Sequence, residues 1–155
     1  MSGLRDRDAL DAALVRTVWN HSEGSLSSVS LIRVVGEGDD RRCLVQARME
    51  PATAEVTRDD LWTDWMALPL LSRFPLRQQV LEEGTMAHTT ASGPVTLFPL
   101  ESPQGIWGLL ELETEVPLTP PSLELLKGIL VTYLNVVGLL DYGERDALTE
   151  LLNRK

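Results

Sequence analysis

The feature that most constrains the fold is a long helical pattern near the C-terminus. Thr119 can cap a helix, and Pro120 suits its first turn because the amide hydrogen that proline lacks would be unbonded there anyway. Apolar residues then recur at helical spacing as far as about Tyr142. Gly143 follows and marks a joint, so we expect one long helix between these limits.

Two apolar stripes run along adjacent faces of this helix. The first has the alternating spacing of a coiled-coil seam and comprises Leu123, Leu126, Leu130, Tyr133, Val137 and Leu140. The second comprises Leu125, Ile129, Val136 and Leu139. One stripe can pack on the chain's own sheet and leave the other for a partner, which predicts a homodimer through terminal helices. We assign its interface to Leu126, Leu130, Tyr133, Val137 and Leu140; the alternative is a helix buried on both sides within one monomer.

Short segments rich in Val, Leu and Ile predict a mainly antiparallel sheet. Residues 28–35 and 42–49 are joined by glycine-rich turn chemistry and predict a hairpin. The clearest strand is 106–115, where Gly108, Leu110 and Leu112 alternate with a second set of side chains. Two further strands are expected at 85–90 and 95–100.

Helices are expected on both sides of this sheet. Residues 4–19 carry an apolar stripe opposite several charged side chains, which predicts a helix packed on the core. Residues 51–84 are expected to be helical and irregular, with a short helix capped by Asp60 and another between Pro75 and Gly84. The order predicts an α+β fold in which the N- and C-terminal helices cover one sheet face and a helical lid covers the other.

Composition excludes several classes of partner and site. The 155-residue chain has a formal net charge of −9, so an acidic surface would repel phosphate backbones and nucleic acid is not an expected partner. Cys43 is the single cysteine, which rules out an intramolecular disulfide and a cysteine-based metal site. The apolar region 125–140 contains Lys127 and Asn135 and is short for a bilayer span. We expect a cytoplasmic protein without membrane insertion.

No catalytic motif or metal-ligand cluster stands out, so we expect no enzyme activity and no resident cofactor or metal. Aromatic, methionine and histidine side chains gather in and after the expected lid. They could line a pocket for an unidentified small molecule between the sheet and the lid, formed by Trp62, Trp65, Met66, Met86, His88, Phe98 and Trp107. The alternative is that these side chains fill a core.

The last ten residues hold a second pattern, which Asp146 or Thr149 could open as a helix cap. Its six fixed positions are Asp146, Leu148, Thr149, Leu151, Asn153 and Arg154. They resemble the D-x-L-T-x-L-x-N-R motif that opens the GGDEF domain of diguanylate cyclases. Glu150 departs from the glycine that family members often carry at that position.

The remainder of the chain resembles the GAF domain, a small-molecule sensor module often placed before GGDEF domains. The resemblance covers roughly 4–142 and rests on the order of elements, the short helix ended by Gly84, and the strand 106–112 that leads into the last helix. A PAS domain is the alternative, but its helices normally sit between its second and third strands. We expect a GAF-like domain over 1–142 and the start of a GGDEF domain over 143–155.

These resemblances imply a function. The chain would be the regulatory sensor and dimerisation part of a diguanylate cyclase-type protein that controls cyclic di-GMP synthesis, with Gly143 as the pivot. GTP and Mg²⁺ would bind only in the GGDEF domain, whose signature loop is absent from this sequence. The alternative is a GAF-like dimerisation scaffold that binds no small molecule.

Overall fold

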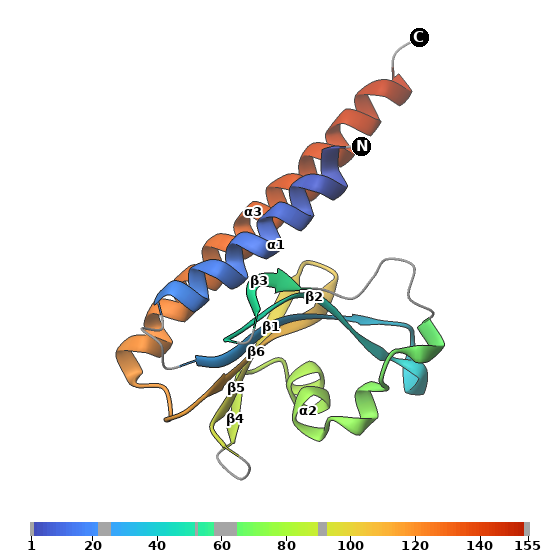
Figure 1. The fold of residues 1–155 in the computed structure, drawn as a ribbon. Coiled ribbons are helices and arrows are strands. Elements are labelled where there is room, and N and C mark those ends of the chain that lie inside the picture. The colour runs from blue at the N-terminus through green and yellow to red at the C-terminus, as the bar shows by residue number, and fades with distance from the viewer. Residues whose placement is uncertain (1, 22–25, 52, 58–64, 90–92, 154–155) are drawn as a thin grey trace.

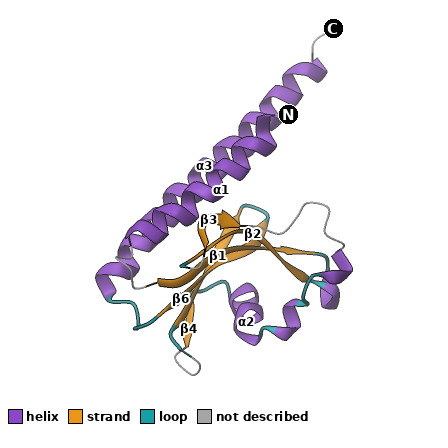
Figure 2. Cartoon of the chain, viewed as in Figure 1, coloured by secondary structure: helices purple, strands orange, loops and turns teal. Residues whose placement is uncertain are grey.

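The structure is a computed structural model that describes residues 2–21, 26–51, 53–57, 65–89 and 93–153. A six-stranded antiparallel sheet lies between two long terminal helices and a shorter helical layer (Figures 1 and 2). The spatial order of the strands is β3-β2-β1-β6-β5-β4. Their bounds are β1 Leu26–Val35, β2 Arg42–Glu50, β3 Thr53–Thr57, β4 Ala87–Thr89, β5 Val95–Ser102 and β6 Gly105–Thr114. The predicted α+β architecture is confirmed.

The centre of the sheet is the pairing of β1 with β6. Leu31 lies opposite Leu110 and Ile32 opposite Leu109 in this ladder, and all four side chains are fully buried. Successive residues of a strand point to opposite faces, so this one pairing supplies both hydrophobic layers. Gly108 stands where a side chain would collide with the backbone, since an added Cβ would lie 2.3 Å from the carbonyl oxygen of Ile32.

The terminal helices cover one face of the sheet. They are α1, Ser2–His21, and α3, Pro120–Asn153, which run side by side in opposite directions (Figure 1). The larger core lies beneath them and includes Val15 and Val18 of α1 and Leu130 of α3. This is the arrangement that the sequence predicts for the two terminal helices.

The other face is covered by the lid, formed by α2, Pro75–Glu83, and by short 3-10 helices at Trp65–Ala67 and Leu71–Arg73. The smaller core beneath the lid contains Ile32, Cys43, Leu71, Val80, Leu97 and Leu109. Gly84 ends α2 in the left-handed conformation, with φ of 72°, as its position after the apolar pattern predicts. The lid is therefore on the predicted face.

Two details of the predicted secondary structure were wrong. The stretch 51–84 was expected to contain no strand, yet β3 lies within it and pairs with the edge of β2. The joint at Gly143 does not exist, because α3 is helical without a break to Asn153. One glycine costs a helix about 1 kcal/mol, which strong helix formers on both sides can offset. Most of the segment expected to form a helix after Asp60 lies outside the described residues.

Within the described residues, one segment, Pro120–Leu140, is long and apolar enough to cross a membrane, with a mean hydropathy of 1.7. It begins before the range 125–140 that was considered short for a bilayer span, and its 21 residues reach the length that a span needs. One face of the segment packs on the sheet in this fold. The absence of membrane insertion stays a prediction.

Candidate functional site

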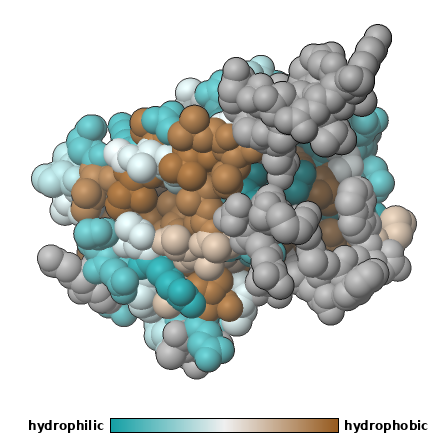
Figure 3. Space-filling model, turned by 90° about the horizontal axis from the view of Figure 1, so that it is seen from above, coloured by the Kyte–Doolittle hydropathy of each residue, from teal (hydrophilic) through white to brown (hydrophobic). Residues whose placement is uncertain are grey.

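An open apolar surface lies between the terminal helices. A groove of about 490 Å³ runs along α1 and α3. It is lined by Leu10, Ala13, Leu14 and Thr17 of α1 and by Glu124, Leu125, Gly128, Ile129, Thr132, Tyr133 and Val136 of α3. Figure 3 looks onto the side of the molecule that carries these helices and shows hydrophobic residues gathered in one patch. We call this surface the helix groove.

The stripe that the sequence assigns to a dimer interface is instead buried within the protomer. Leu126, Leu130, Tyr133 and Val137 are each about 95% or more buried against the sheet and α1, and Leu140 is half-buried. That assignment was wrong. The two faces were separated correctly by their spacing, but spacing cannot tell which face meets the sheet.

The second stripe is the one that faces outward. Leu125 and Leu139 are 48% and 70% exposed, while Ile129 and Val136 are half-buried at the edge of the helix groove. With Thr132 they follow intervals of four, three, four and three residues, which is the spacing of a coiled-coil seam. Exposed leucines at this spacing form a surface suited to another helix.

A buried polar cluster lies under the helix groove. Asp11 of α1 is 1% exposed, and its Oδ1 accepts a hydrogen bond of 2.6 Å from the hydroxyl of Tyr133 on α3. Arg7 Nε lies 3.3 Å from the same oxygen, and Gln46 Nε2 of β2 lies 3.5 Å from Oδ2. Arg7 also stacks 4.7 Å from the ring centroid of Trp107 on β6. We call Asp11, Tyr133, Arg7 and Gln46 the polar hub.

The electrostatics of the hub keep Tyr133 a hydrogen-bond donor. Burial, together with the nearby Asp11 carboxylate, raises the pKa of the Tyr133 phenol, so the hydroxyl retains its proton. Burial also raises the pKa of Asp11, although the bonds from Tyr133 and Arg7 oppose that shift. The site was not predicted because Asp11 was grouped with the charged residues on the solvent side of the first helix. Its helical spacing from the apolar stripe, three residues before Leu14 and four before Val15, is the sequence sign that it faces the core.

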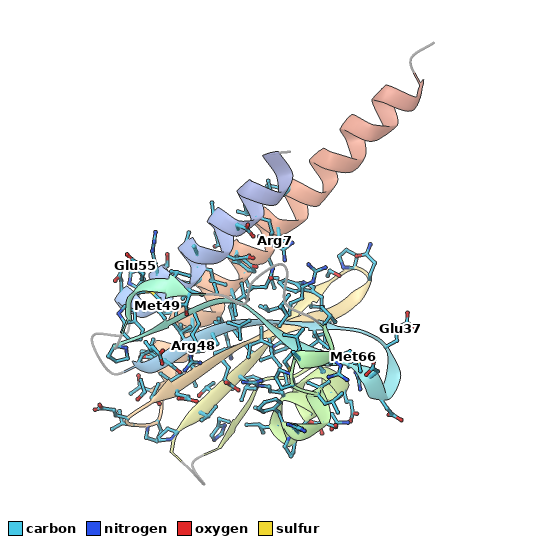
Figure 4. The ribbon with its side chains drawn as sticks, turned by 45° about the vertical axis from the view of Figure 1, so that its right-hand side comes forward. Arg7, Glu37, Arg48, Met49, Glu55 and Met66 are labelled. Carbon is cyan, nitrogen blue, oxygen red and sulfur yellow. The ribbon has the colours of Figure 1, made fainter. Side chains whose placement is uncertain are left out.

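The predicted ligand residues do not come together beneath the lid. Phe98 is buried in the core under the terminal helices, and Met86 and Trp107 pack against that same core. Met66 belongs to the lid but is 70% exposed (Figure 4). The expected placement of these four in one pocket was therefore wrong. Trp62 lies outside the described residues, and only the backbone of Trp65 is described.

Met86 and His88 share a different hollow. It has a volume of about 140 Å³ and lies where β4 and β5 meet the connection between β6 and α3. Thr96, Pro117, Leu118 and Leu123 are among its other lining residues. His88 is exposed there. Among the described residues, no group of three or more His, Cys, Asp or Glu side chains could hold a metal ion.

The lid carries its own polar contacts to the sheet. The Arg42 guanidinium donates to the carbonyl oxygens of Met66 and Leu68, at 3.2 and 2.8 Å, and a hollow of about 420 Å³ adjoins these residues. Cys43 is buried beside Arg77, and burial raises the pKa of the Cys43 thiol. A thiol of this kind is a poor nucleophile, as expected of a core cysteine.

The terminal motif lies on the last part of α3. The backbone from Asp146 to Asn153 is helical and continues the helix that packs on the sheet. Neither Asp146 nor Thr149 caps a separate helix, which corrects that expectation. The side chains of these residues, and Arg154 altogether, lie outside the described part of the chain.

Comparisons with known proteins identify the fold. No protein-family model matches the sequence, and no curated protein matches it significantly. The structure is similar to the blue-light absorbing form of the Thermosynechococcus elongatus PixJ GAF domain, with a TM-score of 0.71 and 15% identity, covering 100% of this chain and 98% of that one.

Two other solved structures are similar over nearly the same extent. A GAF domain/HD domain protein from Geobacter sulfurreducens has a TM-score of 0.64 and 15% identity, covering 91% of this chain and 97% of that one. The second GAF domain of DevS from Mycobacterium smegmatis has a TM-score of 0.62 and 11% identity, covering 90% and 98%. The chain therefore has the fold of a GAF domain.

Proposed function

We propose that this chain is the regulatory and dimerisation domain of a diguanylate cyclase-type signalling protein, with α3 as its output helix. The observation that carries the proposal is the continuity of α3. One helix packs on the sheet through Leu130 and Val137 and then runs without a break to Asn153, within the residues that resemble the start of a GGDEF domain. A rearrangement at the sheet can therefore reach that motif through a rigid element.

The dimer would form through the helix groove. Leu125, Ile129, Val136 and Leu139 supply a seam of apolar side chains, and Gly128 leaves open space at its centre, with no atom within 4 Å of an added Cβ. A second copy of the chain presents the same seam. Two α1–α3 pairs would then form a four-helix bundle, which buries the exposed leucines of both copies.

Regulation in this arrangement acts on the packing of the two output helices. Cyclase chemistry would take place in the following domains, which would bind GTP and Mg²⁺ and must face one another. A small molecule bound to the GAF fold would change this geometry only if it bound one helix arrangement more tightly than another.

A dimerisation scaffold without a ligand is the second candidate, and the lid supplies an observation in its favour. Six described side chains already fill the space between α2 and the sheet. Comparing native with denaturing mass spectra of the purified protein distinguishes the candidates. A sensor with a retained ligand would show added mass only in the native spectrum, and a scaffold would show none.

The direct test is to read the gene beyond the codon for Lys155. An open frame that encodes a Gly-Gly-Asp/Glu-Glu-Phe loop supports the proposal, and a frame without any such domain overturns the cyclase part of it. In the full-length protein, Leu125→Glu combined with Leu139→Glu should abolish both the dimer mass in light scattering and the conversion of GTP to cyclic di-GMP. Lys127→Glu, on an exposed position of the same helix, is the control that should leave both unchanged.

A further inference from the structure

The polar hub is an unusual feature of an otherwise apolar interface. The side chain of Asp11 is 2% exposed, and the core around it contains Leu14, Val15 and Leu130. Among charged side chains, aspartate is almost never fully buried unless it is paired. The hub meets this requirement through partners on α1, α3 and β2, so a single carboxylate contacts three elements.

A gain in folding stability does not account for the presence of the polar hub. Removing a carboxylate and a guanidinium from water costs several kcal/mol per ion, and buried ionic clusters can often be replaced by apolar residues without loss. The surrounding interface already packs through apolar side chains such as Leu14 and Val18. An apolar residue at position 11 would extend that packing.

The hydrogen bond between Asp11 and Tyr133 depends on how α1 is positioned along α3. The bond of 2.6 Å between Tyr133 Oη and Asp11 Oδ1 has the length of a charge-assisted hydrogen bond. If α1 slid along α3 by one helical turn, about 5.4 Å, apolar neighbours could find new contacts. The Asp11 carboxylate would instead keep Arg7 of its own helix but lose Tyr133 and Gln46, and a buried carboxylate that loses hydrogen-bond donors is costly.

We propose that Asp11, through Tyr133, fixes the register of α1 against α3 and so selects one arrangement of the terminal helices. Gln46 ties the same carboxylate to β2, which makes the chosen register depend on the sheet as well as on the helices. The register itself is a property of the folded protomer. Only its consequence for an output domain rests on the proposed function, because α3 would be the element that carries the signal.

The test measures register separately from stability. Spin labels are attached at Arg16→Cys on α1 and Val131→Cys on α3, both exposed positions, in a Cys43→Ala background. Labelled protein is diluted with excess unlabelled protein, so that electron–electron distances report on one protomer even if the chain dimerises. The wild-type hub should give one narrow distance distribution.

Tyr133→Phe removes the hydroxyl but keeps the ring, and Asp11→Leu removes the carboxylate. Each should broaden the distribution about two-fold or add a maximum displaced by up to about 5.4 Å, one helical turn. Thr17→Val is the matched control, since its hydroxyl donates within α1, to the carbonyl oxygen of Ala13 at 2.7 Å. Unchanged distributions in Tyr133→Phe would overturn the proposal, even if Asp11→Leu fails to fold. A change in dimer mass without a change in these distances would count against the register role but not against the dimer.

Discussion

Arg77 of α2 and Glu111 of β6 form a two-point ion pair that fastens the lid to the sheet. Nε and Nη2 of the arginine lie 2.9 and 2.8 Å from the two carboxylate oxygens, and the side chains are 15% and 13% exposed. The Arg77 guanidinium also stacks on Phe74, 3.9 Å from the ring centroid. Lys could supply the charge but neither the planar stacking nor the paired hydrogen bonds.

Arg77→Ala should lower the free energy of unfolding by about 2–4 kcal/mol, because it leaves the Glu111 carboxylate buried without its partner. Urea unfolding followed by tryptophan fluorescence measures this loss. Arg77→Ala combined with Glu111→Ala should lose less than the sum of the single variants. Strict additivity would show that the two side chains are not energetically coupled.

The two apolar stripes of α3 should respond in opposite ways to truncation. Leu130→Ala creates a cavity in the core and should cost about 2–5 kcal/mol of stability. Leu139→Ala removes an exposed side chain and should change protomer stability by less than about 0.5 kcal/mol, while weakening the dimer. Chemical unfolding and light scattering, both at several protein concentrations, separate the two effects. Equal losses of stability would contradict the assignment of the two faces.

The hub should make stability depend on pH. The pKa of Asp11 is raised above its ordinary value of 3.8, so the folded state binds this proton more tightly than the unfolded chain does. This tighter proton binding stabilises the folded state. The stabilisation is fully present at pH values below the pKa of Asp11 in the unfolded chain, and it is lost as the pH rises through the pKa of Asp11 in the folded protein.

Asp11→Asn removes this titration. The stability of the wild type relative to Asp11→Asn should therefore improve as the pH falls from neutrality toward the ordinary aspartate value. Arg7, Asp8 and Tyr133 are the charged and titratable groups that act on Asp11, and all three are retained in the variant. Urea midpoints at a series of pH values test this, and a difference that stays constant with pH would exclude Asp11 as the titrating group.

Gly128 offers a substitution that should stabilise the protomer. It lies within α3 and lines the helix groove, and an added Cβ would meet no atom within 4 Å. Gly128→Ala should raise the free energy of unfolding by about 0.5–1 kcal/mol through helix propensity alone. Gly128→Trp would instead fill the groove and should reduce dimer mass without unfolding the chain. A dimer unaffected by tryptophan there would place the interface elsewhere.

The sequence was sufficient to predict the layers because each depends on a local period. The alternating pattern predicts the strand β6, the helical spacing predicts the helices α1 and α3, and the structure contains all three. The edge strand β3 was missed because it is short, contains polar residues and closely follows Pro51, so no apolar alternation marks it. Its pairing depends on the neighbouring edge of β2 rather than on its own pattern.

The candidate site was harder to predict, because it depends on which face of each element meets which layer. The period of two separates Leu97 from Phe98, yet it does not say that Leu97 faces the lid and Phe98 the terminal helices. In α3, the helical spacing likewise separates two stripes without showing which one packs on the sheet, and the predicted dimer interface was assigned to the buried stripe. Asp11 was missed for a related reason. Its spacing places it on the core face of α1, but the sequence does not show which polar side chains of α3 and β2 lie close enough to bind its carboxylate.

The unbroken helix α3 has a mechanical consequence. Its 34 residues, at a rise of about 1.5 Å each, make a rod about 51 Å long. Side chains from Leu123 to Val137 hold it in the core, and Asn153 lies about 24 Å beyond Val137 at the same rise per residue. A tilt of about 5° in the packed part would therefore move the backbone of Asn153 by about 2 Å, so a small change within the GAF fold becomes a larger displacement at the end of the helix.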